Sequence, residues 1–225
     1  MNSSLSFISP PLHVMRQICL STSCAQEMAL DVYCQAPWPV RLFFWLRLRF
    51  LAWLMRRHEI RRDDTRVLDF GGGSGIFLPT LANAFSSVTL IDRDISNART
   101  LADRLMLKNV HMVAADIVAH DFGEAQFDII VAADVLEHFR EPPLALIRHW
   151  LKPGGRLYTS LPTETWFYDL LRRLFGKTKP PDHYHSAAQV EASLRHAGFK
   201  KIGGLYHPLV WPVLSLFRIS AWQVP

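Results

Sequence analysis

The stretch VLDFGGGSG, Val67 to Gly75, decides the fold class of this chain. An apolar, β-branched run at 66–70 leads directly into four glycines, and a helical pattern of apolar residues then begins at Ile76. Strand, glycine turn and helix form the first half of a βαβ unit. Glycines let the backbone fold sharply and approach a ligand closely. The sequence therefore predicts a ligand site at the carboxyl end of this first strand.

The same alternation continues along the chain on the carboxyl side of the glycine turn. Helical spacing is expected at 76–85, 95–105, 142–150, 167–175 and 186–197, and strands at 88–91, 110–114, 127–132, 155–160, 200–206 and 215–223. Strands that alternate with helices of this length indicate βαβ units and a mostly parallel sheet. The predicted class is α/β.

Composition excludes several classes of protein. The 225 residues are 49% apolar and 20% charged, which excludes disordered, collagen-like and coiled-coil chains. The formal net charge of +5 is weak evidence for nucleic acid, and none is expected as a partner. Cys19, Cys24 and Cys34 are odd in number and fit no metal knuckle, so we interpret them as ordinary thiols in a reducing compartment. Pro10 and Pro11 interrupt the first apolar stretch, and no signal peptide is expected.

An unusual helix is predicted near the amino terminus, at 41–57, with the sequence RLFFWLRLRFLAWLMRR. At helical spacing one broad apolar face comprises Phe43, Phe44, Phe50, Leu51, Leu54 and Met55, whereas Arg41, Arg49 and Arg56 lie opposite and Arg47 falls on the apolar face. The run is too short and too charged to span a membrane. Two interpretations stay open: an interfacial helix on a lipid surface, or a capping helix packed on its own domain.

Two acidic residues follow the second and third strands. Asp92 lies about 20 residues after the glycine turn, where a carboxylate can accept both hydroxyls of a ribose. Asp116, just past the third strand, can reach the same crevice and accept an adenine amino proton. These features permit a dinucleotide or S-adenosylmethionine as cofactor.

Beyond the glycine turn, the chain resembles the class I S-adenosylmethionine-dependent methyltransferases, in particular the small-molecule type grouped with ubiquinone and menaquinone biosynthesis. The matching segments, in the family's order over about 100 residues, are VLDFGGGSG at 67–75, LIDRD at 90–94, AADI at 114–117, FDIIVAADVLEHF at 127–139 and LKPGGRLYTSLP at 151–162. The resemblance implies a Rossmann-like, doubly wound sheet of seven strands, six parallel and the last antiparallel, with helices on both faces. The Ser-rich and Pro-rich composition of residues 1–40 predicts a flexible or capping leader, which a basic aromatic helix at 41–62 follows. The resemblance implies a methyltransferase domain at 63–225 with a substrate cap at about 162–186.

The resemblance further implies a set of cofactor contacts. Gly71 and Gly73 are expected at the methionine and ribose portions, Asp116 with Ile117 at the adenine, and Asp134 at the methionyl end. Asp69 is expected to anchor the first loop. The full set of expected cofactor-binding residues is Asp69, Gly71, Gly72, Gly73, Asp92, Arg93, Asp116, Ile117 and Asp134.

Candidate catalytic and substrate residues follow the fourth and fifth strands. His138 lies where the family places groups beside the methionyl end, so it is a candidate general base, although Glu137 and His138 could instead only hold their loop. His183 and Tyr184 lie in DHYHS at 182–186, which resembles the segment that closes over the substrate. The HxH spacing is a poor metal signature, and no metal site is predicted.

The predicted function is methyl transfer from S-adenosylmethionine to a small, hydrophobic or lipid-tailed acceptor, with O- or C-methylation favoured. Apolar, aromatic and basic flanks at 41–57, 166–179 and 205–222 favour such an acceptor and a peripheral contact with an anionic membrane, so the protein is expected in the cytoplasm or on the inner face of a membrane. Two alternatives remain: a nicotinamide-dependent oxidoreductase, and a catalytically silent member of the fold that serves as a membrane or assembly partner.

Overall fold

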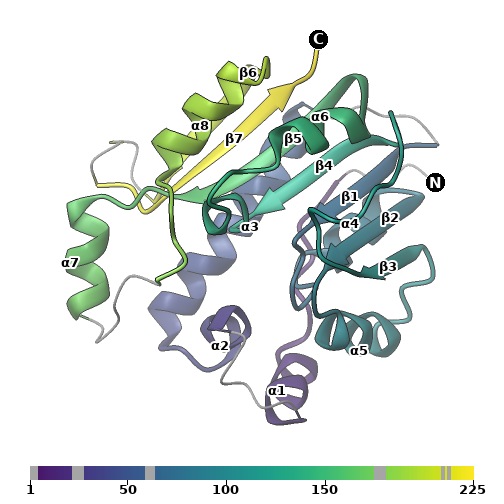
Figure 1. The fold of residues 1–225 in the computed structure, drawn as a ribbon. Coiled ribbons are helices and arrows are strands. Elements are labelled where there is room, and N and C mark those ends of the chain that lie inside the picture. Colours follow the sequence, from purple (N-terminus) through teal and green to yellow (C-terminus); the bar gives the residue numbers. More distant parts are fainter. Residues whose placement is uncertain (1–4, 22–27, 59–63, 175–180, 209–210, 212–213) are drawn as a thin grey trace. The chain divides into compact units, whose positions relative to one another are not determined.

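The computed structural model describes residues 5–21, 28–58, 64–174, 181–208, 211 and 214–225 (Figure 1). Seven strands form one sheet in the order β3-β2-β1-β4-β5-β7-β6. Their bounds are β1 Arg66–Phe70, β2 Ser87–Asp92, β3 Val110–Ala114, β4 Phe127–Ala133, β5 Leu151–Pro162, β6 Lys200–His207 and β7 Phe217–Gln223. The last strand, β7, is antiparallel to both of its neighbours, β5 and β6. The predicted fold class is confirmed.

The chain forms two compact units, Met1–Asp121 and Phe122–Pro225. The first unit holds the helices α1 Leu12–Ser21, α2 Met28–Cys34, α3 Trp38–Arg57, α4 Leu78–Ala84 and α5 Ser96–Arg104 with strands β1 to β3. The second holds η1 Leu136–His138, α6 Leu144–Trp150, α7 Trp166–Leu174 and α8 Ala187–His196 with strands β4 to β7. The division into leader, helix and catalytic domain remains a prediction.

Three parallel strands make the framework of the first unit. β1 pairs with β2 up to Phe70 and Ile91, and β2 pairs with β3 up to Asp92 and Ala114. Apolar side chains of β1 and β2 are fully buried, because both strands lie inside the sheet. This register brings the carboxyl ends of the three strands to one edge, where the glycine turn begins.

The predicted leader contains two helices, α1 and α2. Leu5, Met15, Ile18 and Leu30 are each no more than 2% exposed, so these residues are part of the core. Ile8 N–H donates to Thr80 Oγ1 at 2.9 Å, which ties the segment before α1 to α4. Of the two expectations for the leader, flexible or capping, these contacts favour the capping one. Cys24 lies outside the described residues.

Helix α3 packs through a narrower face than the sequence predicts. Leu51, Leu54 and Met55 are buried as expected, but Phe50 is 37% exposed. Arg47 is 3% exposed, and its guanidinium donates to the Tyr33 hydroxyl at 2.6 Å. This hydrogen bond gives the arginine a polar partner on the apolar side of the helix. The predicted extension of this helix to 62 falls on residues 59–62, outside the described part. Among the described residues, no helix is long and apolar enough to span a bilayer.

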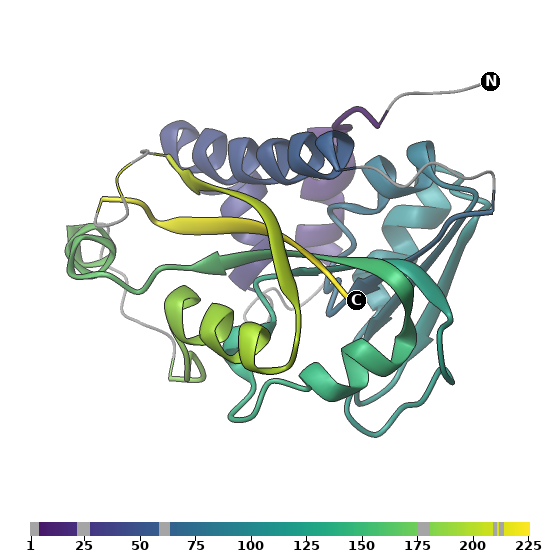
Figure 2. The same ribbon diagram turned by 90° about the horizontal axis from the view of Figure 1, so that it is seen from above.

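A buried carboxylate fixes α8 against β6 and β7 in the second unit. The helix lies along these two strands in both views (Figures 1 and 2). Glu191 is fully buried and accepts hydrogen bonds from Lys201 Nζ and the Ser220 hydroxyl, each at 2.6 Å, and pairs with Arg218 at 3.2 Å. Because a buried charge needs partners, this cluster specifies how α8 docks.

Strand β5 begins four residues before the strand expected at 155–160 and ends two residues after it. Residue Leu151 pairs with Phe127, and the register then shifts before Ile129. The predicted helix at 167–175 corresponds to α7, and its last expected residue lies outside the described part of the chain. The strand expected at 215–223 begins at Phe217.

Candidate functional site

The glycine turn after β1 has the backbone geometry that only glycine adopts readily. Gly71, Gly73 and Gly75 have φ angles of 67°, 49° and 72°. Gly71 N–H donates to the Ile91 carbonyl at 2.9 Å, and Gly73 N–H donates to Asp92 Oδ2 at 2.8 Å. The turn is thus held against the end of β2 by one carbonyl and one carboxylate.

The glycine turn also leaves no room for a side chain at Gly72. A Cβ atom added to Gly72 would come within 2.6 Å of Leu90 Cδ1 and 2.7 Å of Asp69 Oδ2. Asp69 is 3% exposed, and among the residues that the structure describes its buried Oδ2 has no hydrogen-bond partner. Burial first, and the nearby Asp92 carboxylate second, raise the pKa of Asp69 to about 7. A cation beside this carboxyl would stabilise its ionised form and lower its pKa again.

The acidic residues after β2 and β3 lie at the same edge of the sheet. Asp92 is half-buried, and its Oδ1 accepts from the Asp94 N–H at 3.3 Å. Asp116 is exposed and pairs with Arg93 at 3.4 Å, whereas Ile117 is 6% exposed. The structure brings the predicted residues of the first unit together around the ends of β1, β2 and β3.

Asp134 begins the candidate site of the second unit. It follows β4 with a φ of 53°, and its N–H donates to the Ser160 carbonyl at 2.8 Å. This left-handed conformation is uncommon for a residue other than glycine and occurs where a tight turn is stabilised by its surroundings. The chain then enters η1, which carries Glu137 and His138.

His138 is held by a carboxylate from a distant part of the chain. Its Nδ1 lies 2.8 Å from Asp182 Oδ2, and since a carboxylate only accepts, Nδ1 carries the proton and Nε2 keeps its lone pair. Burial is the largest influence and lowers the pKa of His138, as does His183, while Asp182 and Glu164 act in the opposite direction. The imidazole is neutral at neutral pH and can accept a proton or bind a metal ion.

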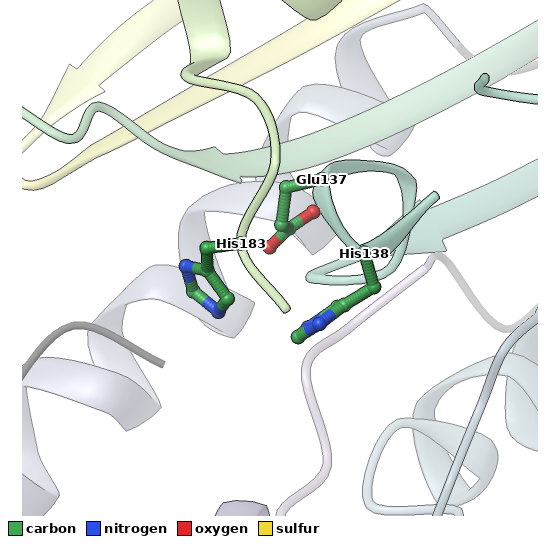
Figure 3. A group of neighbouring side chains, drawn as sticks. All are labelled: Glu137, His138 and His183. Carbon is green, nitrogen blue, oxygen red and sulfur yellow. The ribbon is translucent and has the colours of Figure 1, made fainter. Parts of the chain in front are cut away.

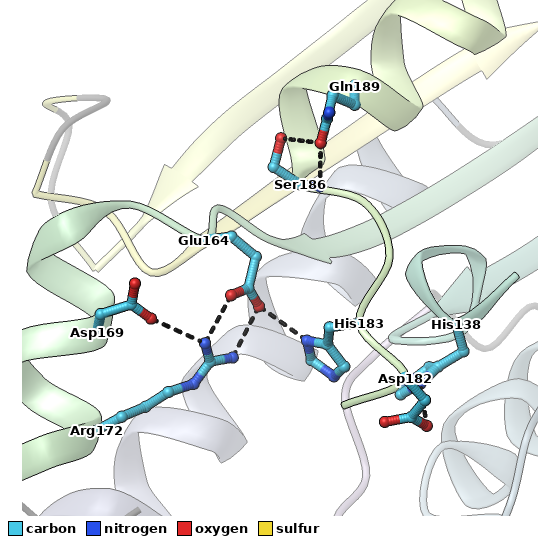
Figure 4. Close-up of polar contacts among 8 residues, drawn as sticks. All are labelled: His138, Glu164, Asp169, Arg172, Asp182, His183, Ser186 and Gln189. Atoms are coloured by element: carbon cyan, nitrogen blue, oxygen red, sulfur yellow. Dashed lines mark hydrogen bonds and ion pairs between the residues drawn. The ribbon is translucent and has the colours of Figure 1, made fainter. Parts of the chain in front are cut away.

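His183 is held in the same way by a second carboxylate (Figure 4). Its Nδ1 lies 2.8 Å from Glu164 Oε1, and Glu164 also accepts two hydrogen bonds from Arg172, at 2.6 and 2.7 Å. Burial opposes ionisation of Glu164, but the hydrogen bonds and charges of Arg172 and His183 prevail and lower its pKa to about 2. The guanidinium of Arg172 also lies 3.9 Å from the centroid of the Tyr168 ring.

Glu137 completes this cluster. Figure 3 shows the side chains of Glu137, His138 and His183 gathered beside η1. The two imidazole rings are 4.6 Å apart between centroids and nearly perpendicular, at 87°. Glu137 is fully buried, and its carbonyl accepts from the Tyr184 N–H at 2.9 Å, which joins the 182–185 loop to η1. Tyr184 itself is 43% exposed, with Arg140 over its ring.

Sequence reasoning did not find Glu164, Arg172 and Asp182 as partners of the two histidines. Asp182 is next to His183, which is a weak signal for a shared site. Glu164 and Arg172 carry no motif that marks them. Their role depends on the path of the chain from β5 through α7, which a sequence pattern does not define.

Comparison with known proteins places the chain in a family. The sequence profile described as a methyltransferase domain matches residues 42–202. A ubiquinone biosynthesis O-methyltransferase of Xylella fastidiosa is 31% identical over 156 residues, which cover 62% of this chain and 63% of that protein. A hybrid PKS-NRPS synthetase of Macrophomina phaseolina is 35% identical over 129 residues, 52% of this chain but 3% of that protein. The chain thus spans less than two thirds of the length of these relatives.

A solved structure agrees with this placement at the level of the fold. The N-methyltransferase NodS from Bradyrhizobium japonicum, in complex with S-adenosyl-L-homocysteine, matches with a TM-score of 0.66 and 20% identity over 94% of this chain and 98% of that one. The chain belongs to the methyltransferase domain family, and its fold is that of the class I S-adenosylmethionine-dependent enzymes. The cofactor of this class is S-adenosylmethionine.

Proposed function

We propose that this chain transfers a methyl group from S-adenosylmethionine to an oxygen or carbon atom of a small hydrophobic acceptor. The observation that carries the choice of acceptor atom is the neutral imidazole of His138, whose Nδ1 is occupied by Asp182. An acceptor that must lose a proton, such as a phenol or an enolisable carbon, needs a neutral base of this kind. The name of the Xylella fastidiosa relative, an O-methyltransferase of ubiquinone biosynthesis, supports the same class of acceptor.

The residues of the first unit suit the proposed cofactor. When bound, S-adenosylmethionine supplies a methyl group on a positively charged sulfonium. Asp69 offers a buried carboxyl whose ionised form a nearby positive charge would stabilise, and the narrow space at Gly72 admits backbone contact but no side chain. The role that we assign to Asp92 is to accept the ribose hydroxyls, as an acid at the end of the second strand does in such folds. We assign the cofactor contacts to Asp69, Gly71, Gly72, Gly73, Asp92, Arg93, Asp116, Ile117 and Asp134.

In the second unit, the proposed base is His138 and the proposed substrate contacts are His183 and Tyr184. His138 Nε2 accepts the acceptor's proton, while Asp182 keeps the opposite ring nitrogen protonated. Alignment of acceptor and methyl group supplies most of the acceleration, since effective molarities of about 10⁵ M are reached in well-oriented reactions. The half-buried surroundings of His138 and His183 limit competing water.

Calorimetric titration with S-adenosylmethionine and, separately, with NADH tests the cofactor. We expect micromolar binding of the first, lost in Asp92→Ala and retained in the control Asp94→Ala, because the exposed Asp94 carboxylate accepts its hydrogen bonds from Ser96. Binding of NADH alone would favour the oxidoreductase alternative. Binding of neither would favour the silent member of the fold.

Formation of S-adenosylhomocysteine with a panel of phenolic acceptors, with and without an alkyl tail, tests the reaction. We expect His138→Ala to lower kcat at least 10²-fold, with most of the loss recovered at higher pH for acidic phenols. The control His185→Ala changes a histidine of the same loop whose Nε2 contacts the Arg140 carbonyl. Equal activity of His138→Ala and wild type with every acceptor would refute the base.

A peripheral membrane contact through 41–57 is also part of the proposal. The exposed residues of α3 are mostly aromatic or basic: Trp38, Pro39, Leu42, Arg49, Phe50, Trp53, Arg56 and Arg57. Such a surface suits an anionic lipid interface, where aromatic rings insert and arginines pair with phosphates. It would bring a lipid-tailed acceptor to the enzyme.

Flotation with vesicles that contain anionic or only zwitterionic lipid tests this contact. Trp38 and Trp53 are 68% and 39% exposed, so a double change to alanine leaves the core of α3 intact. We expect binding to anionic vesicles that falls at high salt and in the double variant. Binding unaffected by these substitutions would remove the support for the lipid-facing role of α3.

A further inference from the structure

The cluster of Glu137, His138 and His183 has the composition of a transition-metal site. Each residue offers one ligand atom, and these three atoms all lie within 4.8 Å of one another. Two histidines and one glutamate are the protein ligands of zinc in one group of catalytic sites, where a fourth position stays open for water or substrate. The three side chains come from η1 and from the loop before α8, so two separate segments converge on one point (Figure 3).

The orientation of both imidazoles supports this interpretation. Metal-binding histidines nearly always donate their other ring N–H to a carboxylate or carbonyl, which fixes the tautomer and the ring. Here His138 Nδ1 donates to Asp182 at 2.8 Å and His183 Nδ1 donates to Glu164 at 2.8 Å. Both rings therefore keep the Nε2 lone pair for a ligand.

The distances and charges fit a divalent ion of the first transition row. Zinc binds nitrogen and carboxylate oxygen at about 2.0–2.2 Å, so tetrahedral ligand atoms lie about 3.3 Å apart. Because the three atoms now lie within 4.8 Å of one another, each pair would approach by at most about 1.5 Å to reach that arrangement. Once ionised, Glu137 would contribute one buried negative charge, and the carboxylates of Glu164 and Asp182 lie behind the rings with Arg172 beside Glu164.

We propose that Glu137, His138 and His183 bind a divalent transition-metal ion such as Zn²⁺, with an open position for an oxygen of the acceptor. The metal site itself does not depend on the proposed function. Only the assignment of the acceptor oxygen to the open position rests on the proposed methyl transfer. Coordination lowers the pKa of a bound hydroxyl. The hydroxyl proton then leaves to solvent, the acceptor oxygen forms a bond to the methyl carbon, and the bond from that carbon to sulfur breaks, which leaves a neutral thioether. In the metal-bound protein His138 is a ligand, and the ion takes over the task of the base.

Metal binding is measured first, without cofactor or acceptor. The full chain, free of any histidine tag, is treated with a chelator, dialysed and titrated with Co²⁺, whose visible absorption reports low-coordinate nitrogen and oxygen ligands. Zn²⁺ is then added as a competitor. We expect one Co²⁺ per chain, displaced by one Zn²⁺. A folded chain that binds no Co²⁺ above a background of weak, spectrally octahedral sites would overturn the proposal.

Matched variants locate the ion. We expect His183→Ala and Glu137→Gln to weaken Co²⁺ binding at least 10²-fold, and Glu164→Gln to weaken it 10- to 100-fold through the orientation of His183. The control His185→Ala should bind as wild type does, since it changes the same loop outside the cluster. Glu137 is buried, so circular dichroism checks folding, and His183→Ala carries the test if Glu137→Gln does not fold. Unchanged binding in His183→Ala contradicts the site.

Turnover separates this inference from the proposed function. Methyl transfer that survives complete removal of metal, together with absent Co²⁺ binding, would retain the base mechanism and overturn the metal site. Methyl transfer that is lost with the chelator and restored by Zn²⁺ in wild type, but not in His183→Ala, supports the site. A protein that binds Co²⁺ as described and transfers no methyl group would keep the site and refute the proposed reaction.

Discussion

Replacement of Asp69 by asparagine should remove a specific dependence of stability on pH. The folded protein raises the pKa of this carboxyl from its ordinary value of 3.8 to about 7. Between these two values the folded chain holds a proton that the unfolded chain has released, so the free energy of unfolding falls as pH rises. Each pKa unit is worth about 1.4 kcal/mol, so the full effect is about 4 kcal/mol. The part between pH 5 and pH 7 is about 2 kcal/mol.

Urea denaturation at half-unit steps from pH 5 to pH 8, followed by circular dichroism, measures this effect. Wild type should lose about 2 kcal/mol from pH 5 to pH 7, whereas Asp69→Asn, which keeps the shape and carries no charge, should lose far less. The control Asp94→Asn changes an exposed carboxyl whose pKa is lowered by hydrogen bonds from Ser96, and it should keep the wild-type slope over this range. Parallel curves for wild type and Asp69→Asn would refute the reasoning.

Three other predictions test side-chain contacts within the two units. Gly72→Ala should lower the free energy of unfolding by about 1–3 kcal/mol, because its Cβ would lie 2.6 Å from Leu90 Cδ1. Thermal denaturation measures this loss, and no loss would mean that the turn can shift to make room. Arg172→Met should lower the free energy of unfolding by about 2 kcal/mol above pH 4 and by less at pH 2. The reason is that the pKa of Glu164 is about 2, so protonation of this carboxylate breaks its ion pair with Arg172. Equal losses at both pH values would contradict the ion pair. Cys19 and Cys34, buried with their Sγ atoms 2.7 Å apart, should form a disulfide with a mild disulfide oxidant, which mass spectrometry detects as the loss of two hydrogens; two unreacted thiols after unfolding in alkylating agent would show that the pair stays reduced.

Local sequence patterns were sufficient to predict the parallel strands of the sheet and the candidate cofactor residues of the first unit. The glycine turn and the acids after β2 and β3 are encoded within a few residues of each strand end, and the parallel register of β1 to β3 brings strand ends to one edge whatever the details of packing. For the same reason the positions of Gly72 and Asp92 followed from spacing alone. The raised pKa of Asp69 did not, because burial is a property of the folded core.

Helix α3 shows where a periodic pattern is incomplete. Helical spacing placed Arg47 on the apolar face as an exception, and the structure explains the exception through Tyr33, a residue of α2. Spacing also placed Phe50 on the buried face, yet the neighbouring helices leave it 37% exposed. Periodicity defines a direction around the helix axis, but the width of the buried face depends on which elements cover it.

The sequence by itself determined the α/β class, the glycine turn and the acids at the ends of β2 and β3, because each depends on local conformation and on the period of two or 3.6 residues. Only the tertiary structure decided that Asp182 would hold His138, 44 residues away, and that Glu164 with Arg172 would hold His183. Contacts between segments so far apart depend on loop paths and on the burial of charges, which no local pattern contains.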